Sequence, residues 1–418
     1  MIIQGRILTD PSQPPAIGWL RIEGGRIAEV REGAPPSDQV PPRHGGVDRL
    51  ITPAFIDAHM HFPQIDSVGC DGLPLLEWLD QVIFPAEAWW GRGAARAMAS
   101  TAVRRLVRQG TCGVAAYMTS HDAVNHEVLQ EIIRRTPLRI IAGRVGMDRN
   151  APDELTEHDR ARAAARPTPS PTLAPIDADA ARCAVSMNPR FAISCTDELL
   201  AEFGWVAKER PDTFVQTHLA ESVPECEFVR ELFPESPHYT GVYDGFGLLH
   251  QRTLLAHCVH LSAAEWRLIR ERGAVVVHCP AANIFLQSGL FDLDAARRHG
   301  VRLALGSDVA AGSDIAMPRV ARGMIETAKI RRMCGVSTDG YVPSPAEAWD
   351  LITRGNAAAL GWKDAGRIEV GAAADLLVLR PPPTWFDAHL IGRLIHNWTS
   401  RLIETRIFNG APVDPAAM

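Results

Sequence analysis

The run ITPAFIDAHMH, residues 51–61, is apolar over most of its length and ends in two histidines separated by one residue. A short apolar run of this kind is typical of a strand that is buried on both faces. Further runs of the same type follow, and amphipathic helical patterns separate them. The eight predicted strands are Ile51–His61, Thr111–Ser120, Arg139–Asp148, Cys183–Phe191, Phe214–Glu221, Thr253–Leu261, Ala274–Ala282 and Val301–Val309.

Eight alternations of strand and helix predict an α/β fold, a (β/α)8 TIM-like barrel over residues 51–365. A doubly wound open sheet is the alternative, but no glycine-rich dinucleotide loop follows an early strand. Residues 1–50 and 366–418 are rich in short β-patterned runs, and chain ends often lie close together. They predict one small β-sandwich domain built from both termini. Segment 166–175, RPTPSPTLAP, contains four prolines, which exclude a helix and predict an extended surface loop.

The bulk composition excludes several classes of protein. A net charge of -6 and a pI near 6.2 argue against a nucleic-acid-binding surface, because phosphates require a basic face. The first residues lack the basic and apolar regions of a signal peptide, and no apolar run reaches the ~18 residues of a membrane span. The eight cysteines form no CxxC pair and indicate reduced thiols. We therefore expect a cytoplasmic protein with neither nucleic acid nor membrane as a partner.

Candidate reactive residues lie at the predicted strand ends, where side chains of such a barrel project into its mouth. His59 and His61 end the first strand, and the alternation of side chains points both in one direction. His218 lies near the end of the fifth strand, His257 in the sixth and Asp308 at the end of the eighth. Each is weak evidence alone, because a single strand-end histidine is usually structural. Their shared position at one rim predicts a metal site.

This order of residues resembles the amidohydrolase superfamily, and the resemblance extends over the whole chain. It includes residues 52–61, the segment His278-Cys279-Pro280 and the return to the small domain at 371–375. Within the superfamily the sequence is most similar to the guanine deaminase family. The segments that carry this similarity are HFPQ (61–64), LLEWL (75–79), FPAE (84–87), IAG (141–143), MDRNAP (147–152), PRF (189–191), THLAE (217–221), HCVHL (257–261) and SGLF (288–291).

The resemblance implies a metal ion. Its ligands would be His59, His61, His218 and Asp308. Binuclear members commonly bridge two metals with a lysine at the end of the fourth strand, but the first lysine in this chain, Lys208, lies well past that strand. We therefore expect one Zn²⁺ per subunit, with Fe²⁺ as the alternative because the same ligand set accepts several divalent ions.

The resemblance also implies a reaction, the zinc-dependent hydrolytic deamination of guanine to xanthine and ammonia. It assigns Glu221 as the group that protonates a ring nitrogen and later carries a proton to the departing amine. His257 and Asp308 are expected to orient the attacking water and to accept its proton.

Four residues are expected to contact the purine base. Gln64 offers both a donor and an acceptor to its edge, and Arg190 offers a rigid set of donors to the C6 carbonyl. Phe191 and Trp78 would form apolar walls. The structural interpretation stays open for Arg190, since an arginine before an aromatic residue is often a surface ion pair. It also stays open for Trp78, since a tryptophan in a helical LLEWL pattern is often a core residue.

Two other functions are consistent with the sequence. The first is a deaminase or chlorohydrolase acting on another aminoheterocycle, such as a pterin, an oxidised purine or a triazine. The second is a non-catalytic binding protein, which is disfavoured because all four predicted ligands and Glu221 are present. The family resemblance further implies a homodimer.

Overall fold

The computed structural model describes residues 1–36, 44–156 and 182–418, so the proline-rich segment 166–175 lies outside the described residues. Eight parallel strands form the larger sheet, in the order β12-β11-β10-β9-β8-β7-β6-β5. Their bounds are β5 Phe55–His61, β6 Thr111–Tyr117, β7 Arg139–Gly146, β8 Cys183–Pro189, β9 Phe214–Leu219, β10 Thr253–His257, β11 Val275–His278 and β12 Arg302–Leu305.

The last strand meets the first. Just past β12, the amide of Asp308 donates to the carbonyl of His59 at 2.8 Å, and the amide of His61 donates to the carbonyl of Val309 at 3.1 Å. Together with the strand order, these bonds confirm the predicted (β/α)8 barrel.

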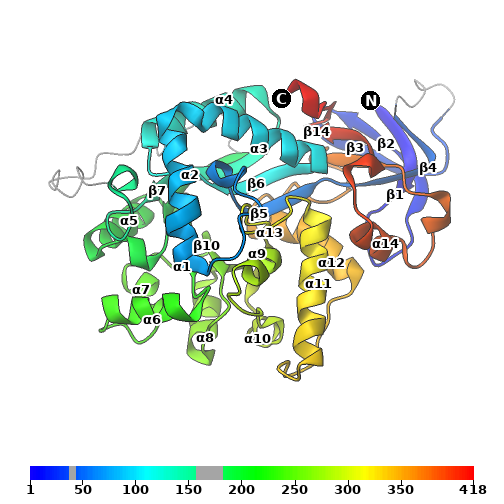
Figure 1. The fold of residues 1–418 in the computed structure, drawn as a ribbon. Coiled ribbons are helices and arrows are strands. Elements are labelled where there is room, and N and C mark those ends of the chain that lie inside the picture. Colours follow the sequence, from blue (N-terminus) through cyan, green and yellow to red (C-terminus); the bar gives the residue numbers. More distant parts are fainter. Residues whose placement is uncertain (37–43, 157–181) are drawn as a thin grey trace.

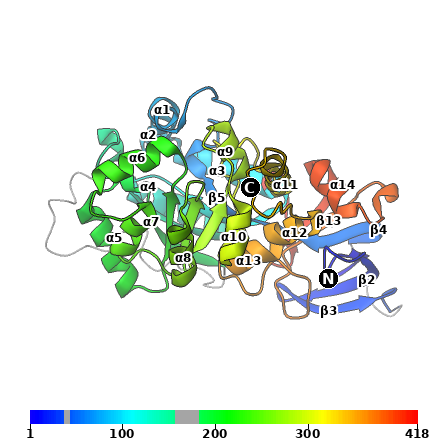
Figure 2. The same cartoon turned by 90° about the horizontal axis from the view of Figure 1, so that it is seen from below.

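Helices cover the outside of the barrel (Figures 1 and 2). Their bounds are α1 Leu75–Trp78, α2 Phe84–Trp89, α3 Ala95–Gln109, α4 Asp122–Arg135, α5 Asp197–Glu209, α6 Val223–Leu232, α7 Tyr239–Gly245, α8 Ala263–Arg272, α9 Pro280–Phe285, α10 Leu293–His299, α11 Met317–Met333, α12 Pro345–Asp350 and α13 Asn356–Ala359. The α3 helix shows why the sequence folds this way. It buries Ala99, Val103 and Leu106 on one face and ends at Gly110, whose left-handed φ of 89° suits a residue without Cβ. None of the described helices combines the length and apolar character needed to cross a membrane.

Both ends of the chain build the second sheet, as predicted. Its seven strands have the order β15-β14-β13-β4-β1-β2-β3 and lie beside the barrel in Figure 1. Their bounds are β1 Ile2–Ile7, β2 Ala16–Glu23, β3 Arg26–Glu32, β4 His44–Pro53, β13 Leu376–Leu379, β14 Ile403–Phe408 and β15 Ala411–Pro412. The helix α14, Leu390–His396, lies between β13 and β14 in the chain. The pairing of β4 with β13 joins N-terminal and C-terminal residues in one sheet.

A buried ion-pair cluster links the small sheet to the barrel. The carboxylate of Asp375 lies 3.0 Å from Nε of Arg139 and 3.3 Å from Nη2 of Arg182. It also accepts the amide of Asn409 at 2.7 Å. Since the side chain of Asp375 is only 1% exposed, these donors hold a charge that water does not reach. The cluster fixes the orientation of the barrel floor against the second sheet.

Candidate metal centre and active site

Three strand ends turn sharply at the barrel mouth. Ala220 after β9, His257 at the end of β10 and Asp308 after β12 have left-handed φ angles of 50°, 73° and 48°. Residues other than glycine rarely adopt this conformation, and such strain is concentrated at functional sites. The turns direct side chains from different strands toward one point.

The predicted ligands meet at that point. His59, His61, His218 and Asp308 each offer one ligand atom, and these atoms all lie within 4.8 Å of one another. Asp308 Oδ1 is 3.2 Å from Nε2 of His59 and 3.3 Å from Nε2 of His61. Nε2 of His218 is 3.2 Å from Nε2 of His61. Three imidazole nitrogens and one carboxylate around a common centre are a donor set that zinc accepts.

The protonation states of the imidazole rings are compatible with metal binding. Burial lowers the pKa of His61 to about 4 and that of His218 well below its usual value. Both rings are therefore neutral near pH 7 and keep a lone pair for a ligand. Nδ1 of His218 lies 2.6 Å from the carbonyl oxygen of Arg190, to which it donates. This bond leaves Nε2 of His218 unprotonated and facing the other ligands.

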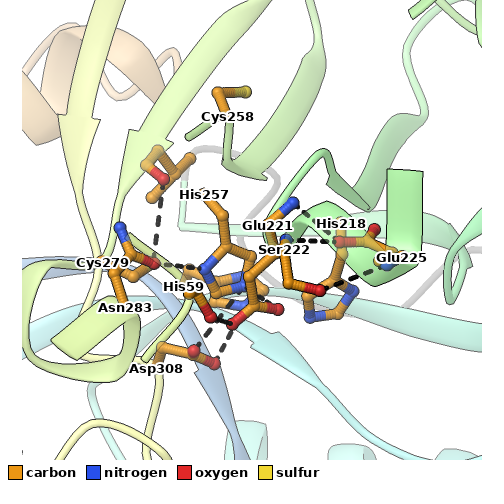
Figure 3. Close-up of polar contacts among 12 residues, drawn as sticks. His59, His218, Glu221, Ser222, Glu225, His257, Cys258, Cys279, Asn283 and Asp308 are labelled. Atoms are coloured by element: carbon orange, nitrogen blue, oxygen red, sulfur yellow. Dashed lines mark hydrogen bonds and ion pairs between the residues drawn. The ribbon is translucent and has the colours of Figure 1, made fainter. Parts of the chain in front are cut away.

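Glu221 and His257 border the ligand cluster (Figure 3). Nε2 of His257 is 3.4 Å from Oε2 of Glu221 and 3.7 Å from Oδ2 of Asp308. Burial, reinforced by the negative charge of Asp308, raises the pKa of Glu221 well above its usual value. Glu221 is thus suited to hold a proton that it can deliver.

A capping box holds the main chain of Glu221. The sequence Ser222-x-x-Glu225 begins α6, and the side chain of each residue bonds to the main chain of the other. Oε2 of Glu225 also accepts the amide of Glu221 at 2.7 Å. The local sequence therefore fixes the position from which Glu221 reaches the ligand cluster.

Two residues to which the sequence analysis gave no role hydrogen-bond to His257 and Glu221. Oδ1 of Asn283 lies 2.9 Å from Nδ1 of His257, so the proton on that nitrogen points away from the ligand cluster. The Ser288 hydroxyl donates to Oε1 of Glu221 at 3.2 Å. Ser288 lies in the SGLF segment, but nothing in local residue patterns pairs it with Glu221.

The cysteines at this rim are not activated. Cys279 has a sulfur near His257 and Asp308, but burial raises the pKa of its thiol well above the usual value. Cys258 is also buried with a raised pKa, and Figure 3 shows it apart from the cluster. Neither thiol is ionised near neutral pH, which disfavours a nucleophilic or ligating role.

The ligand cluster lies at a pocket in the barrel mouth. All four expected substrate contacts line it, together with His61, His218, Glu221, His257 and Asp308. Trp78 donates its indole N–H to the carbonyl of Cys70 at 2.8 Å, which holds the ring at the pocket wall. Phe191 is 5% exposed and follows Arg190 at the end of β8. The pocket thus combines apolar side chains with a few polar groups beside the ligand cluster, as is typical of small-molecule sites.

Gln64 and Arg190 lie in this pocket and share a partner that sequence reasoning missed. Glu87 in α2 accepts Nε2 of Gln64 at 3.0 Å and Nη1 of Arg190 at 2.5 Å. Arg190 is therefore no surface ion pair, since it is 2% exposed and its partner is fully buried. The FPAE segment contains Glu87, but a helical pattern does not reveal a buried carboxylate.

Comparisons with known proteins agree with this geometry. The amidohydrolase family model matches residues 50–411. Guanine deaminase from Escherichia coli is 34% identical over 372 residues, which cover 88% of this chain and 82% of that protein. Human guanine deaminase is 32% identical over 336 residues, which cover 79% of this chain and 73% of that protein.

Solved structures give the same grouping. A guanine deaminase from C. acetobutylicum with bound guanine superposes with a TM-score of 0.89 at 27% identity, over 99% of both chains. The E. coli guanine deaminase structure gives a TM-score of 0.86 at 29% identity, also over 99% of both chains. A triazine hydrolase gives 0.80 at 19% identity over 100% of this chain and 95% of its own, which shows a shared fold alone. The chain belongs to the amidohydrolase family and, within it, groups with the guanine deaminases.

Proposed function

We propose that this protein is a hydrolytic guanine deaminase that converts guanine and water to xanthine and ammonia, with one Zn²⁺ per subunit. The observation that carries the proposal is a pocket whose lining combines three of the predicted metal ligands, His61, His218 and Asp308, with Glu221, Gln64 and Arg190. The similarity to guanine deaminases from several organisms supports the same substrate.

A divalent metal held by His59, His61, His218 and Asp308 would lower the pKa of water and make it nucleophilic near neutral pH. The protein's own groups would then manage the protons. Glu221, whose pKa is raised, would donate its proton to a ring nitrogen of guanine as the water oxygen adds to C2. His257 and Asp308 would accept the proton that the water loses.

The second half of the reaction breaks the bond between C2 and the amino nitrogen. Glu221, now ionised, would take up the proton of the C2 hydroxyl and carry it to that nitrogen, so that ammonia leaves and the C2 oxygen remains as the new carbonyl of xanthine. The proton that His257 or Asp308 accepted from the water would then return to Glu221. Asn283 would keep Nε2 of His257 as a proton acceptor, because its Oδ1 accepts a hydrogen bond from the Nδ1–H of that ring and so holds the proton on Nδ1. One water is consumed and one ammonia is released in each cycle.

Recognition of the purine would come from other residues of the same pocket lining. Arg190 would donate to the C6 carbonyl of guanine, an atom that adenine lacks, and Gln64 would bond to the purine edge. Phe191 and Trp78 would cover the ring faces. The family resemblance also supports a cytoplasmic homodimer, which sedimentation of the purified protein would test.

The deciding experiment measures ammonia release and ultraviolet absorbance with purified protein on guanine, adenine, a pterin, 8-oxoguanine and an aminotriazine. We expect turnover of guanine to xanthine, loss of activity after chelation, and recovery with Zn²⁺. Conversion of the pterin or the triazine but not of guanine would favour the alternative aminoheterocycle function.

A further inference from the structure

The carboxylate of Glu87 is buried behind the pocket wall. Glu87 lies in α2 and is 0% exposed, and the pocket lining does not include it. Each of its two oxygens bonds to a different pocket residue: Oε1 accepts Gln64 at 3.0 Å, and Oε2 accepts Arg190 at 2.5 Å. A buried carboxylate with two such donors is stable only as an acceptor for both.

The bond to Gln64 fixes the orientation of its side-chain amide. The amide oxygen of Gln64 accepts the main-chain amide of Ala310 at 3.4 Å, while its nitrogen donates to Glu87. The opposite amide orientation would place an oxygen against a carboxylate and would lose both bonds. Glu87 therefore selects the donor and acceptor pattern that Gln64 offers to a purine.

The bond to Arg190 balances the positive charge of its guanidinium group and also fixes the orientation of that group. Arg190 is 2% exposed, with its guanidinium carbon 5.4 Å from the ring centre of Phe84. Among the described residues, Glu87 is the one carboxylate within ion-pair distance of Arg190, so its loss would leave this buried cation without a direct partner. Glu87 neutralises that cation, and a charge-assisted bond holds the donors of Arg190 in one direction.

We propose that Glu87 is a positioning residue that sets substrate specificity through Gln64 and Arg190, without touching the substrate. The proposal rests on the proposed function and deepens it. It predicts that Glu87 favours a neutral ring with an oxygen at C6. Loss of its charge would weaken the recognition of that oxygen more than it would weaken the chemistry at C2.

The test compares Glu87→Gln with the wild-type protein on guanine and on 2-aminopurine, which lacks the C6 oxygen. We expect kcat/KM for guanine to fall about 10- to 100-fold, mostly through KM, as expected for the loss of a charge-assisted bond. We expect a smaller fall for 2-aminopurine. Glu87→Asp, which keeps the charge, should recover part of the discrimination. Glu77→Gln, on an exposed residue of α1, is the matched control.

A double-mutant cycle tests whether Glu87 acts through its partner. In an Arg190→Gln background, adding Glu87→Gln should cause little further loss for guanine. Metal content should stay at the wild-type level in every variant, because His218 bonds to the main-chain oxygen of Arg190 and not to its side chain. Additive losses, or equal losses for both purines, would overturn the positioning role.

Equilibrium binding separates this proposal from the proposed function. If the wild-type protein binds guanine but releases no ammonia from it, the deaminase function fails. The positioning role then stands if Glu87→Gln weakens guanine binding more than 2-aminopurine binding, and it falls if both weaken equally. If Glu87→Gln does not fold, Glu87→Asp on the same two purines decides by the same comparison.

Discussion

His278 should make the stability of the metal-free protein sensitive to acid. Its ring is 1% exposed and stacks on Phe291, with ring centroids 4.4 Å apart and planes at 18°. Within the part of the chain that the structure describes, Nδ1 of His278 has no hydrogen-bond partner. Burial, with a smaller contribution from His257, lowers its pKa from 6.5 to about 3. The folded protein therefore keeps this ring neutral at a pH where the unfolded chain protonates it.

The direction in which stability changes with pH follows from proton uptake by the unfolded chain. A histidine with a lowered folded-state pKa contributes stability that is complete above pH 6.5 and is lost as the pH falls toward about 3. Between these two pKa values the unfolding free energy changes by about 1.4 kcal/mol per pH unit for one titrating group. Between about pH 7.5 and 4.5 the loss is roughly 2.6 kcal/mol, of which about 1.4 kcal/mol is lost by pH 5.5.

The assay is urea unfolding of metal-free protein across this pH range, for the wild-type protein and for His278→Gln. Removal of the metal prevents its acid release from contributing to the slope. The unfolding free energy of the variant is expected to fall less between about pH 7.5 and 4.5 than that of the wild-type protein, by roughly 2.6 kcal/mol. This difference does not depend on the absolute stability of the variant. His389→Gln, on an exposed residue before α14, is the control and should leave the slope unchanged. Parallel curves for His278→Gln and the wild-type protein would refute the reasoning.

Three further substitutions separate chemistry, metal binding and fold. Glu221→Gln should keep the metal and bind guanine but lose about 10²- to 10⁴-fold in kcat, measured by xanthine formation, because it removes the proton donor; full activity would exclude the shuttle role. His59→Ala should lose the metal itself, as measured by metal analysis of the purified protein, and a full metal content would show that His59 is not a ligand. Asp375→Ala should cost about 3–5 kcal/mol in chemical unfolding, because it leaves two buried arginines without their shared carboxylate; a change below about 1 kcal/mol would show that the cluster is unimportant for stability.

The barrel could be predicted because its periodicity is local. Buried strands and amphipathic helices alternate regularly enough to give the number of strands and their order. The positions at which the strands end were predicted less accurately. The predicted run Ala274–Ala282 contains β11, Val275–His278, but α9 begins at Pro280, where proline suits the first turn of a helix. The run Val301–Val309 likewise shortens to β12, Arg302–Leu305, because the chain turns toward the ligand cluster before Asp308.

The types of residue at successive strand ends predicted which side chains would meet at the barrel mouth, and the structure brings these candidate ligands together. Their hydrogen-bond partners could not be predicted. Glu87 and Arg190 are 103 residues apart, and Ser288 and Glu221 are 67 residues apart. Nothing in a linear pattern indicates that these groups are buried together. His278 shows the opposite difficulty, since its motif belongs to the family resemblance while its ring packs on Phe291.

The left-handed residues explain why the rim could not be predicted in detail. In a regular strand side chains three residues apart point to opposite faces, so a regular continuation of β9 would not aim both His218 and Glu221 at one centre. The left-handed conformation of Ala220 redirects the chain between them, and His257 and Asp308 adopt the same conformation at the ends of their own strands, at a cost of order 1–3 kcal/mol each. Residue types at these positions do not require the conformation, because only glycine adopts it without strain. The closed barrel and the bonds from Glu225 and Asn283 must therefore impose it, which makes the geometry of the rim a property of the whole fold.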